Sequence, residues 1–180
     1  MGGFLLYNKN SDQIIPENAL NIFERKKQKI VKDINCVDYR IITFNKRSFE
    51  NQNFFCFDSG GFVASSGTPI YKNFSGEKAA AELYNDFKNN LKIDFKNFFG
   101  HFCYIIYVEG KLFLFNDFNG VYHVYHDAEN IIFSNSFLAV SNSLKNKNIS
   151  KQGLYEYVFY GATFGRDTII ENIKQLTNKK

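Results

Sequence analysis

A two-residue connection between two β-type runs most constrains what this chain can fold into. Residues 102–108 and 111–115 are rich in aromatic and branched apolar side chains, and only Glu109-Gly110 separates them. So short a connection joins antiparallel neighbours, because a crossover between parallel strands needs a dozen residues or more. Further short β-type runs, bounded by polar or glycine turns, lie at residues 3–7, 39–44, 54–57, 61–65, 121–125 and 131–133. The sequence therefore predicts a meander of antiparallel strands.

Three segments have the apolar spacing of helices instead. The first starts at Pro16, a residue suited to a first helical turn, and its spacing continues to Ile30 and Val31. The second spans residues 77–90, and the third spans 152–160, with Ser150 as its N-cap and Gly161 at its end. Two antiparallel sheets packed face to face and covered by helices suit this order better than a parallel doubly wound sheet, so we expect an α+β sandwich.

Composition narrows the class of protein. A length of 180 residues with 44% hydrophobic content suits one domain with its own core, and no apolar run approaches the roughly 20 residues of a membrane span. Three widely spaced cysteines without a CxxC pair suit a reducing compartment, so we expect a cytoplasmic protein. The net charge is +4, and the one dense basic run, residues 25–29, falls within the first helical pattern. A solvated helix face explains that run better than a nucleic-acid site.

Several motifs in the second half occur in an order typical of one family. The segments 100–104 (GHFCY), 116–125 (NDFNGVYHVY) and 133–136 (FSNS) resemble, in sequence and spacing, the GxFA, RDxxGxxPLYY and FASE motifs of the asparagine synthetase family. Residues 149–176 resemble the segment by which that family leaves its N-terminal amidotransferase domain. The resemblance covers nearly the whole chain, weakly before Ser65 and closely after Phe99. It implies a four-layer αββα sandwich of two antiparallel sheets, the Ntn-hydrolase fold of class II glutamine amidotransferases.

The resemblance also implies that the glutaminase site is degenerate. In the family, the nucleophile is a cysteine that becomes the first residue after methionine removal, because its free amino group can act as the base. Gly2 stands at that position, followed by Gly3 as in the family motif. A glycine has no side chain with which to attack a carbonyl. We therefore expect a domain that has lost glutamine hydrolysis.

The resemblance also assigns residues of this chain to the other positions of the family's glutamine pocket. Ser66 replaces the asparagine of the family's NGE loop, which helps form the oxyanion hole, and Gly67 keeps its glycine. Gly76 replaces the aspartate that holds the amino group of glutamine, and Glu77 could take that role in an alignment shifted by one residue. Arg40 fits the arginine that binds the glutamine carboxylate. The resemblance thus implies a vestigial substrate pocket formed by Gly2, Arg40, Ser66, Gly67, Gly76 and Glu77.

Simpler interpretations exist for several of these residues. Arg40 within a strand is more often an ion-pair residue than a carboxylate clamp. Gly67 and Gly120 suit turns that need a positive φ angle, and Asp117 suits a brace for its own turn. Gly2 suits a flexible chain start, although a strand beginning at Gly3 favours a packed one.

The sequence offers no convincing metal or cofactor site. Residues 58–66 (DSGGFVASS) superficially resemble a pyrophosphate-binding SGGxDS loop, but they lack its internal aspartate and suit a glycine hairpin. His123 and His126 would point to opposite faces of one strand. His101 and Cys103 share a face, but two ligands are too few for a metal ion. We expect no cofactor in this chain.

The expected function follows from the resemblance. Residues 1–165 would form a non-catalytic amidotransferase-like domain, and 166–180 would begin the connection to an ATP-dependent synthetase domain that binds ATP and magnesium beyond Lys180. The parent protein would form amide bonds as a ligase. The expected partners are that synthetase domain, in cis or in trans, and a second copy in a homodimer, with no nucleic acid and no membrane.

Two alternatives stay open. The chain could be a separate, non-enzymatic subunit that contacts a synthetase through residues 166–176. It could also be an active glutaminase domain in which Gly2 is an engineered substitution. The additional changes at Ser66 and Gly76 argue against the second alternative, because one mutation would not alter three positions.

Overall fold

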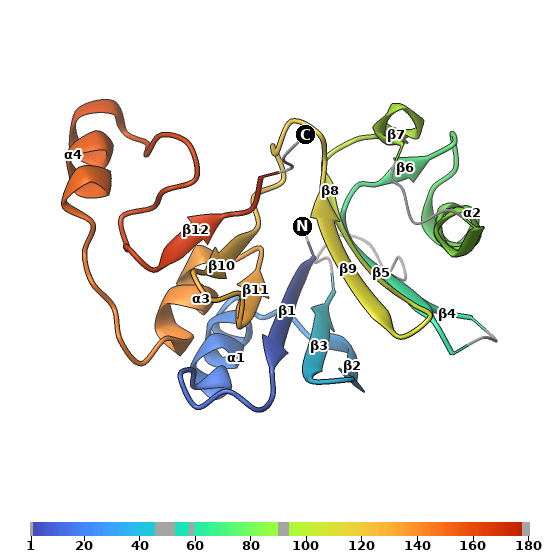
Figure 1. Cartoon of the computed structure of the whole chain (residues 1–180), viewed down its shortest axis with the longest axis horizontal. Coiled ribbons are helices and arrows are strands. Elements are labelled where there is room, and N and C mark those ends of the chain that lie inside the picture. The colour runs from blue at the N-terminus through green and yellow to red at the C-terminus, as the bar shows by residue number, and fades with distance from the viewer. Residues whose placement is uncertain (1, 46–52, 58–59, 90–93, 178–180) are drawn as a thin grey trace.

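Two antiparallel sheets form the centre of the molecule in the computed structural model, which describes residues 2–45, 53–57, 60–89 and 94–177 (Figure 1). The six-stranded sheet has the order β12 (Ile173–Gln175), β10 (Tyr125–Asp127), β11 (Ile132–Ser134), β1 (Gly3–Asn8), β3 (Tyr39–Phe44) and β2 (Ile30–Cys36). The four-stranded sheet has the order β4 (Phe54–Cys56), β5 (Phe62–Gly67), β8 (Phe102–Val108) and β9 (Lys111–Asn116). A short third sheet pairs β6 (Ile70–Tyr71) with β7 (Phe98–Phe99), which follows the 3₁₀ turn Phe95–Asn97.

Alternation along the central strand β1 explains why the two large sheets pack against each other. Phe4 and Leu6 belong to a buried cluster that includes residues of both sheets, among them Ile41, Ala64 and Ile105. Leu5 and Tyr7, which point to the opposite face, belong to the cluster beneath the first helices. A strand that is apolar on both faces must be covered on both, and a sandwich supplies the two covers.

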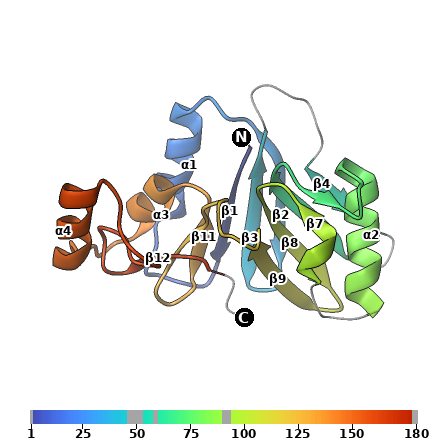
Figure 2. The ribbon, with the colours of Figure 1, turned by 90° about the horizontal axis from the view of Figure 1, so that it is seen from above.

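Helices cover the outer faces of the two sheets (Figures 1 and 2). The helices α1 (Pro16–Arg25) and α3 (Phe137–Ser143) lie on the six-stranded sheet through Phe23 and Val140. The helix α2 (Gly76–Asn89) lies on the four-stranded sheet through Leu83 and Phe87. The molecule is thus an α+β sandwich with antiparallel sheets, as the sequence predicts. A fourth helix, α4 (Lys151–Tyr160), stands at the end of the molecule away from both sheets.

Several local predictions are confirmed. Val108 pairs with Lys111 across the β8–β9 turn, where Glu109 and Gly110 have φ angles of 50° and 77°, as a tight hairpin turn requires. At α4, the Ser150 hydroxyl accepts a hydrogen bond from the Gly153 amide, and Gly161 ends the helix in the left-handed conformation. Strands β4 and β5 form the hairpin expected at the glycine turn, of which residues 58–59 lie outside the described residues.

Two boundaries differ from the prediction. Helix α1 ends at Arg25, and Ile30 and Val31 open strand β2, which pairs with β3 from Ile30 to Cys36 with a bulge at Val31. The basic run therefore spans the helix end and the following turn, because pairing with β3 outweighs the local helical spacing. In the segment 121–125, only Tyr125 is in a strand. None of the helices in the described ranges is long and apolar enough to cross a membrane.

Candidate functional site

Gly2 lies buried at the start of β1, and its carbonyl is the centre of a polar network. This oxygen accepts hydrogen bonds from the Ser66 hydroxyl at 2.9 Å, the Asn135 side-chain amide at 3.3 Å and the Tyr122 hydroxyl at 3.4 Å. Ser66 belongs to the four-stranded sheet, whereas Asn135 directly follows β11 of the six-stranded sheet. The network therefore fastens the start of β1 to both sheets.

The side chains of this network also bind one another and the next residue. Ser66 and Tyr122 share a hydrogen bond between their hydroxyls, and the Asn135 carbonyl oxygen accepts from the Phe4 amide at 3.1 Å. Burial raises the pKa of Tyr122 far above its ordinary value, so the phenol stays a neutral donor at physiological pH. Each hydroxyl has one proton, so when Ser66 donates to the Gly2 carbonyl, Tyr122 donates either to Ser66 or to that carbonyl. These neutral groups hold the backbone in place, and none of them is an activated nucleophile.

Asp117 positions Tyr122 for this role. Its carboxylate accepts hydrogen bonds from the Val121 amide at 2.9 Å and the Tyr122 amide at 2.7 Å. Gly120 has a φ angle of 66° in the same turn. Asp117 is thus a brace for its turn, and Gly120 is a turn glycine with a positive φ angle. Both observations match the simpler interpretations of the sequence.

The turn after Ser66 connects the network to a cavity. Gly67 has a φ angle of 93°, and a Cβ atom there would lie 2.1 Å from the His101 carbonyl oxygen. Gly100 is confined in the same way, since its Cβ would lie 2.2 Å from the Thr68 carbonyl oxygen. The Thr68 amide donates to the His101 carbonyl at 2.8 Å. Only glycines at positions 67 and 100 allow the two backbone segments to lie so close. This contact places Thr68 in the cavity wall.

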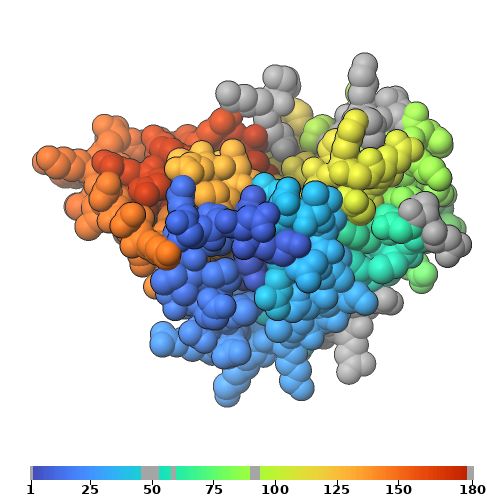
Figure 3. Space-filling view, turned by 60° about the horizontal axis from the view of Figure 1, so that its bottom comes forward, coloured from blue at the N-terminus to red at the C-terminus, as the bar shows by residue number. Residues whose placement is uncertain are grey.

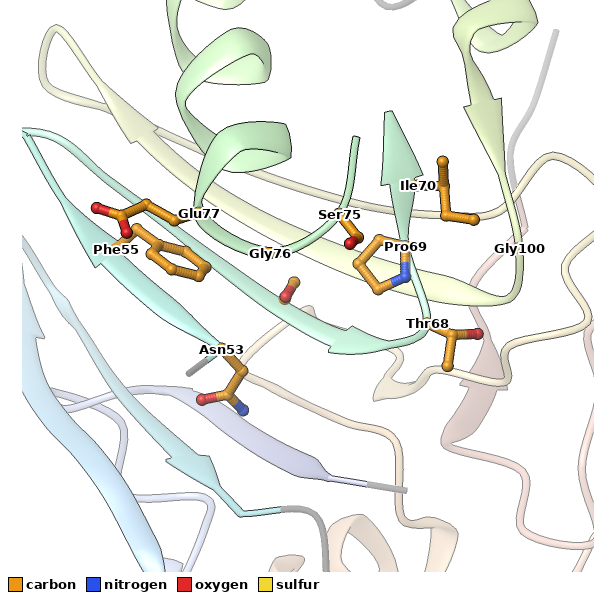
Figure 4. Close-up of a pocket in the computed structure, with 10 residues that line it drawn as sticks. Asn53, Phe55, Thr68, Pro69, Ile70, Ser75, Gly76, Glu77 and Gly100 are labelled. Atoms are coloured by element: carbon orange, nitrogen blue, oxygen red, sulfur yellow. The ribbon is translucent and has the colours of Figure 1, made fainter. Parts of the chain in front are cut away.

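The cavity has a volume of about 570 Å³ and lies at the beginning of α2 (Figure 4). This size is within the range of small-molecule sites. Its wall combines apolar side chains with hydroxyls, one amide and one carboxylate, from Asn53, Phe55, Ser65, Thr68, Pro69, Ile70, Ser75, Gly76, Glu77 and Gly100. Ser65 and Ser66 are adjacent on β5 and point to opposite faces, so the cavity and the Gly2 network share this strand.

Asn53 has an unsatisfied acceptor in the cavity wall. The residue is only 5% exposed, and its side-chain N–H donates to the Phe44 carbonyl at 3.3 Å. Its side-chain oxygen has no hydrogen-bond partner within the described part of the chain. A buried acceptor without a partner costs about 1–3 kcal/mol, and this oxygen is enclosed by protein atoms and not open to the cavity.

The predicted pocket residues do not form one pocket. Gly2, Ser66 and Gly67 lie at the network, Gly76 and Glu77 line the cavity, and Arg40 lies apart from both. Arg40 pairs with Tyr7 across β1 and β3, whereas Gly3 pairs with Phe44, so Arg40 lies four residues, about 13 Å, along the strand from that end. Its guanidinium donates to the Asp33 carboxylate at 2.7 and 2.9 Å and to the Tyr7 hydroxyl at 3.1 Å. These bonds raise the pKa of Arg40 and lower that of Asp33. Arg40 is therefore an ion-pair residue at the surface.

Sequence reasoning missed Tyr122, Asn135 and Asn53. A tyrosine directly after the Asp117–Gly120 turn offers a weak signal, since that turn fixes its backbone amide. Nothing in this asparagine-rich sequence distinguishes the two asparagines from the others. Among the residues that the structure describes, no three His, Cys, Asp or Glu side chains lie close enough to hold a metal ion.

Comparison with known proteins does not identify a family for this chain. No known protein-family model matches this chain, and none of the curated proteins is significantly similar to it.

Proposed function

We propose that this chain is a non-catalytic class II glutamine amidotransferase-like domain, with an Ntn-hydrolase fold, of an asparagine synthetase-related protein. The observation that carries the proposal is the surroundings of Gly2. It lies buried at the start of a central strand of an α+β sandwich, beside the 66–68 turn, and it has no side chain to act as a nucleophile. The motif resemblance in the second half and the layered arrangement of helices and sheets support the same family.

The chemistry of the network explains why this site would not hydrolyse glutamine. Ser66, at the oxyanion-hole position in the resemblance, donates to the protein's own Gly2 carbonyl. Within the described residues, the bonds of its hydroxyl are to Gly2 and Tyr122, neither of which supplies a basic side chain. A serine without a base is a weak nucleophile. The Ser66 hydroxyl, which the resemblance places at the oxyanion hole, thus stabilises the chain just before β1.

The cavity remains suited to a small ligand with an amino or amide group. Glu77 supplies a carboxylate, which is an acceptor for N–H donors. Thr68 and Ser75 add hydroxyls, while Phe55 and Pro69 would contact a short aliphatic chain. An amino acid has this combination of groups. Glu77 would then take the role of the aspartate that Gly76 replaces.

In the parent protein, this domain would support a synthetase domain that uses ATP and magnesium to activate a carboxylate. Free ammonia or another amine would then be the nucleophile, since this domain would release none. Through a ligand bound in the cavity, the domain would respond to the concentration of an amino acid, or the ligand would stabilise the domain. In either case the ligand would not be consumed.

A glutamate-release assay on the Gly2→Cys variant tests the loss of catalysis. We expect no glutamate from glutamine in either the original protein or this variant, because Ser66 and Gly76 remain altered. Gly2→Ala is the matched control, since it adds a side chain without a thiol. Turnover by Gly2→Cys but not by Gly2→Ala would overturn the proposal and support an active site disabled at one position.

A further inference from the structure

A second cavity lies at the end of β1 opposite Gly2, where the Asn8 amide donates to the Ile131 carbonyl at 2.8 Å. Its volume is about 400 Å³, which is within the range of small-molecule sites. Four chain segments form its wall: residues 12–13, 127–129, 144–146 and Asn172. Figure 3 shows one face of the molecule, on which the start of the chain (blue) lies beside its last third (orange and red).

Gln13 joins three of these segments. Its side-chain amide donates to the Glu129 carboxylate at 2.9 Å, and its backbone carbonyl accepts from the Lys145 amide at 3.2 Å. Next to this contact, Ile14 and Leu144 form an isolated β-bridge. The loop before α1 is thus fixed both to the turn after β10 and to the residues after α3.

Asn172 completes a ring of contacts. Its backbone carbonyl accepts from the Ala128 amide at 2.8 Å, and its side-chain amide donates to the Asn146 carbonyl at 3.2 Å. Together with the bonds of Gln13, four hydrogen bonds connect the four segments in a closed cycle. A cavity whose wall is fixed in this way binds a ligand with less loss of conformational entropy than a flexible one.

Charged side chains of both signs line this cavity. The carboxylates are those of Asp12, Asp127 and Glu129, and the ammonium group is that of Lys145. Among the residues that the structure describes, none of these four groups takes part in an ion pair. Opposite charges that line one cavity without pairing can each bind an oppositely charged group of a ligand.

Asp127 contributes a fixed charge to the wall. It is only 4% exposed. Its carboxylate accepts hydrogen bonds from the backbone amides of Glu129 at 3.0 Å, Ile131 at 2.6 Å and Ile132 at 2.9 Å. Backbone amides orient a carboxylate but do not cancel its charge, so Asp127 adds to the negative charge of Asp12 and Glu129. The wall therefore combines three negative groups with one positive group.

This arrangement suits a short peptide with free ends. No three His, Cys, Asp or Glu side chains in the described ranges lie close enough to hold a metal ion, which favours an organic cation. The charged groups come from different segments of the wall, so a matching ligand carries its two charges at separate ends. A free amino acid carries both on one carbon atom, whereas a dipeptide carries them at its two ends. The amides of Gln13 and Asn146 would bind the peptide bond between them.

We propose that this cavity binds a dipeptide as a zwitterion, with its ammonium group at Asp12 and Glu129 and its carboxylate at Lys145. Leu144, which is 8% exposed, supplies an apolar contact for a side chain of the ligand. The site goes beyond the proposed function, because it shares no residue with the cavity at the start of α2 and does not depend on Gly2. Binding of both ends selects a peptide of this length over longer ones.

Titration followed by nuclear magnetic resonance, with three forms of one dipeptide, tests the proposal. At pH 7, glycylglycine carries both charges, its C-terminal amide only the ammonium group and its N-acetyl form only the carboxylate. We expect the loss of either charge to weaken binding at least tenfold, because each loss removes a charge-assisted hydrogen bond. Glycine, with both charges on one carbon atom, should also bind more weakly. If any of these three compounds bound as tightly as glycylglycine, or if glycylglycine did not bind at about 20 mM, the proposal would be wrong.

Two variants assign the ends of the ligand. Lys145→Gln should weaken binding of glycylglycine about tenfold but should not weaken binding of its C-terminal amide. Glu129→Gln should also weaken binding of glycylglycine but not that of the N-acetyl form, and the new side chain keeps an acceptor for Gln13. The matched control is Lys147→Gln, since Lys147 is exposed and lies outside the cavity wall. Equal losses in Lys145→Gln and Lys147→Gln would contradict a specific role of Lys145.

The same titrations locate the ligand. We expect glycylglycine to shift the backbone amide signals of Ala128 and Asn146, which belong to this cavity. The amide signals of Thr68 and Gly100, at the other cavity, should stay unchanged. Shifts confined to Thr68 and Gly100 would place the dipeptide in the other cavity and overturn the proposal.

Discussion

The Gly2 network and the neighbouring cavity share strand β5 but differ in how their polar groups are satisfied. In the network, the hydroxyls of Ser66 and Tyr122 and the amide of Asn135 all bind the Gly2 carbonyl. In the cavity wall, Ser75 and Glu77 are exposed and carry a hydroxyl and a carboxylate. Buried polar groups that bind one another hold a structure together, whereas exposed ones can be reached by a ligand. The comparison supports the proposed function, in which the network has no catalytic role and the cavity has room for a ligand.

The largest effect is expected at the turn that joins the two regions. Gly67→Ala should lower the free energy of unfolding by about 3 kcal/mol or more, because the added Cβ would lie 2.1 Å from the His101 carbonyl oxygen at a φ angle of 93°. Urea denaturation measures this loss. Gly110→Ala is the control, since that glycine also has a positive φ angle but nothing within 4 Å of the new atom. Equal losses in the two variants would disprove the close approach at Gly67.

A smaller effect is expected within the network. Ser66→Ala removes the 2.9 Å hydrogen bond to the Gly2 carbonyl and should cost about 1–2 kcal/mol of stability. The affinity of the cavity for a ligand should not change, since Ser66 points away from it. Ser75→Ala, in the cavity wall, should leave stability within about 0.5 kcal/mol. If Ser66→Ala abolished ligand binding without destabilising the protein, the division into two regions would be wrong.

A substitution in the cavity should affect ligand binding and not stability. Glu77→Gln should leave stability nearly unchanged, because Glu77 is exposed. It should weaken binding of an amino acid at least tenfold, since a neutral amide replaces the carboxylate that would pair with the ligand's ammonium group. Calorimetric titration gives the affinity. Equal affinity in both proteins would exclude Glu77 as a ligand-binding residue.

The smallest effect is expected at Arg40, outside both regions. Asp33→Asn should cost less than about 1 kcal/mol at pH 7, since the Arg40–Asp33 pair is partly exposed. Arg40 holds the pKa of Asp33 below its ordinary value of 3.8, so the contribution is present above that pH and is lost as the pH falls through the lowered pKa. Urea denaturation of both proteins at pH 7 and pH 3 should therefore show a shrinking difference. A difference that grew toward pH 3 would contradict the ion pair.

Much of the fold could be predicted from local patterns, and much of the site could not. The β8–β9 hairpin and the caps of α4 depend on a few adjacent residues, such as Glu109-Gly110 and Ser150, which the sequence displays directly. The end of α1 depends on pairing between β2 and β3, which helical spacing does not record. Arg40 shows the same limit, since its partner Asp33 follows from the register of those strands. The network around Gly2 joins residues 64, 120 and 133 positions apart, and no local pattern announces such contacts.

The most direct test of binding without catalysis is one nuclear magnetic resonance titration with glutamine labelled with ¹⁵N at its side-chain amide. The spectra of one sample show the backbone amide signals of the cavity residues. They also show whether the labelled side-chain amide of glutamine is hydrolysed. We expect shifts at Thr68, Gly76 and Gly100, small shifts elsewhere, and no release of labelled ammonia over many hours. Release of ammonia would contradict the loss of catalysis, and unchanged cavity amides at about 10 mM glutamine would contradict the retained pocket.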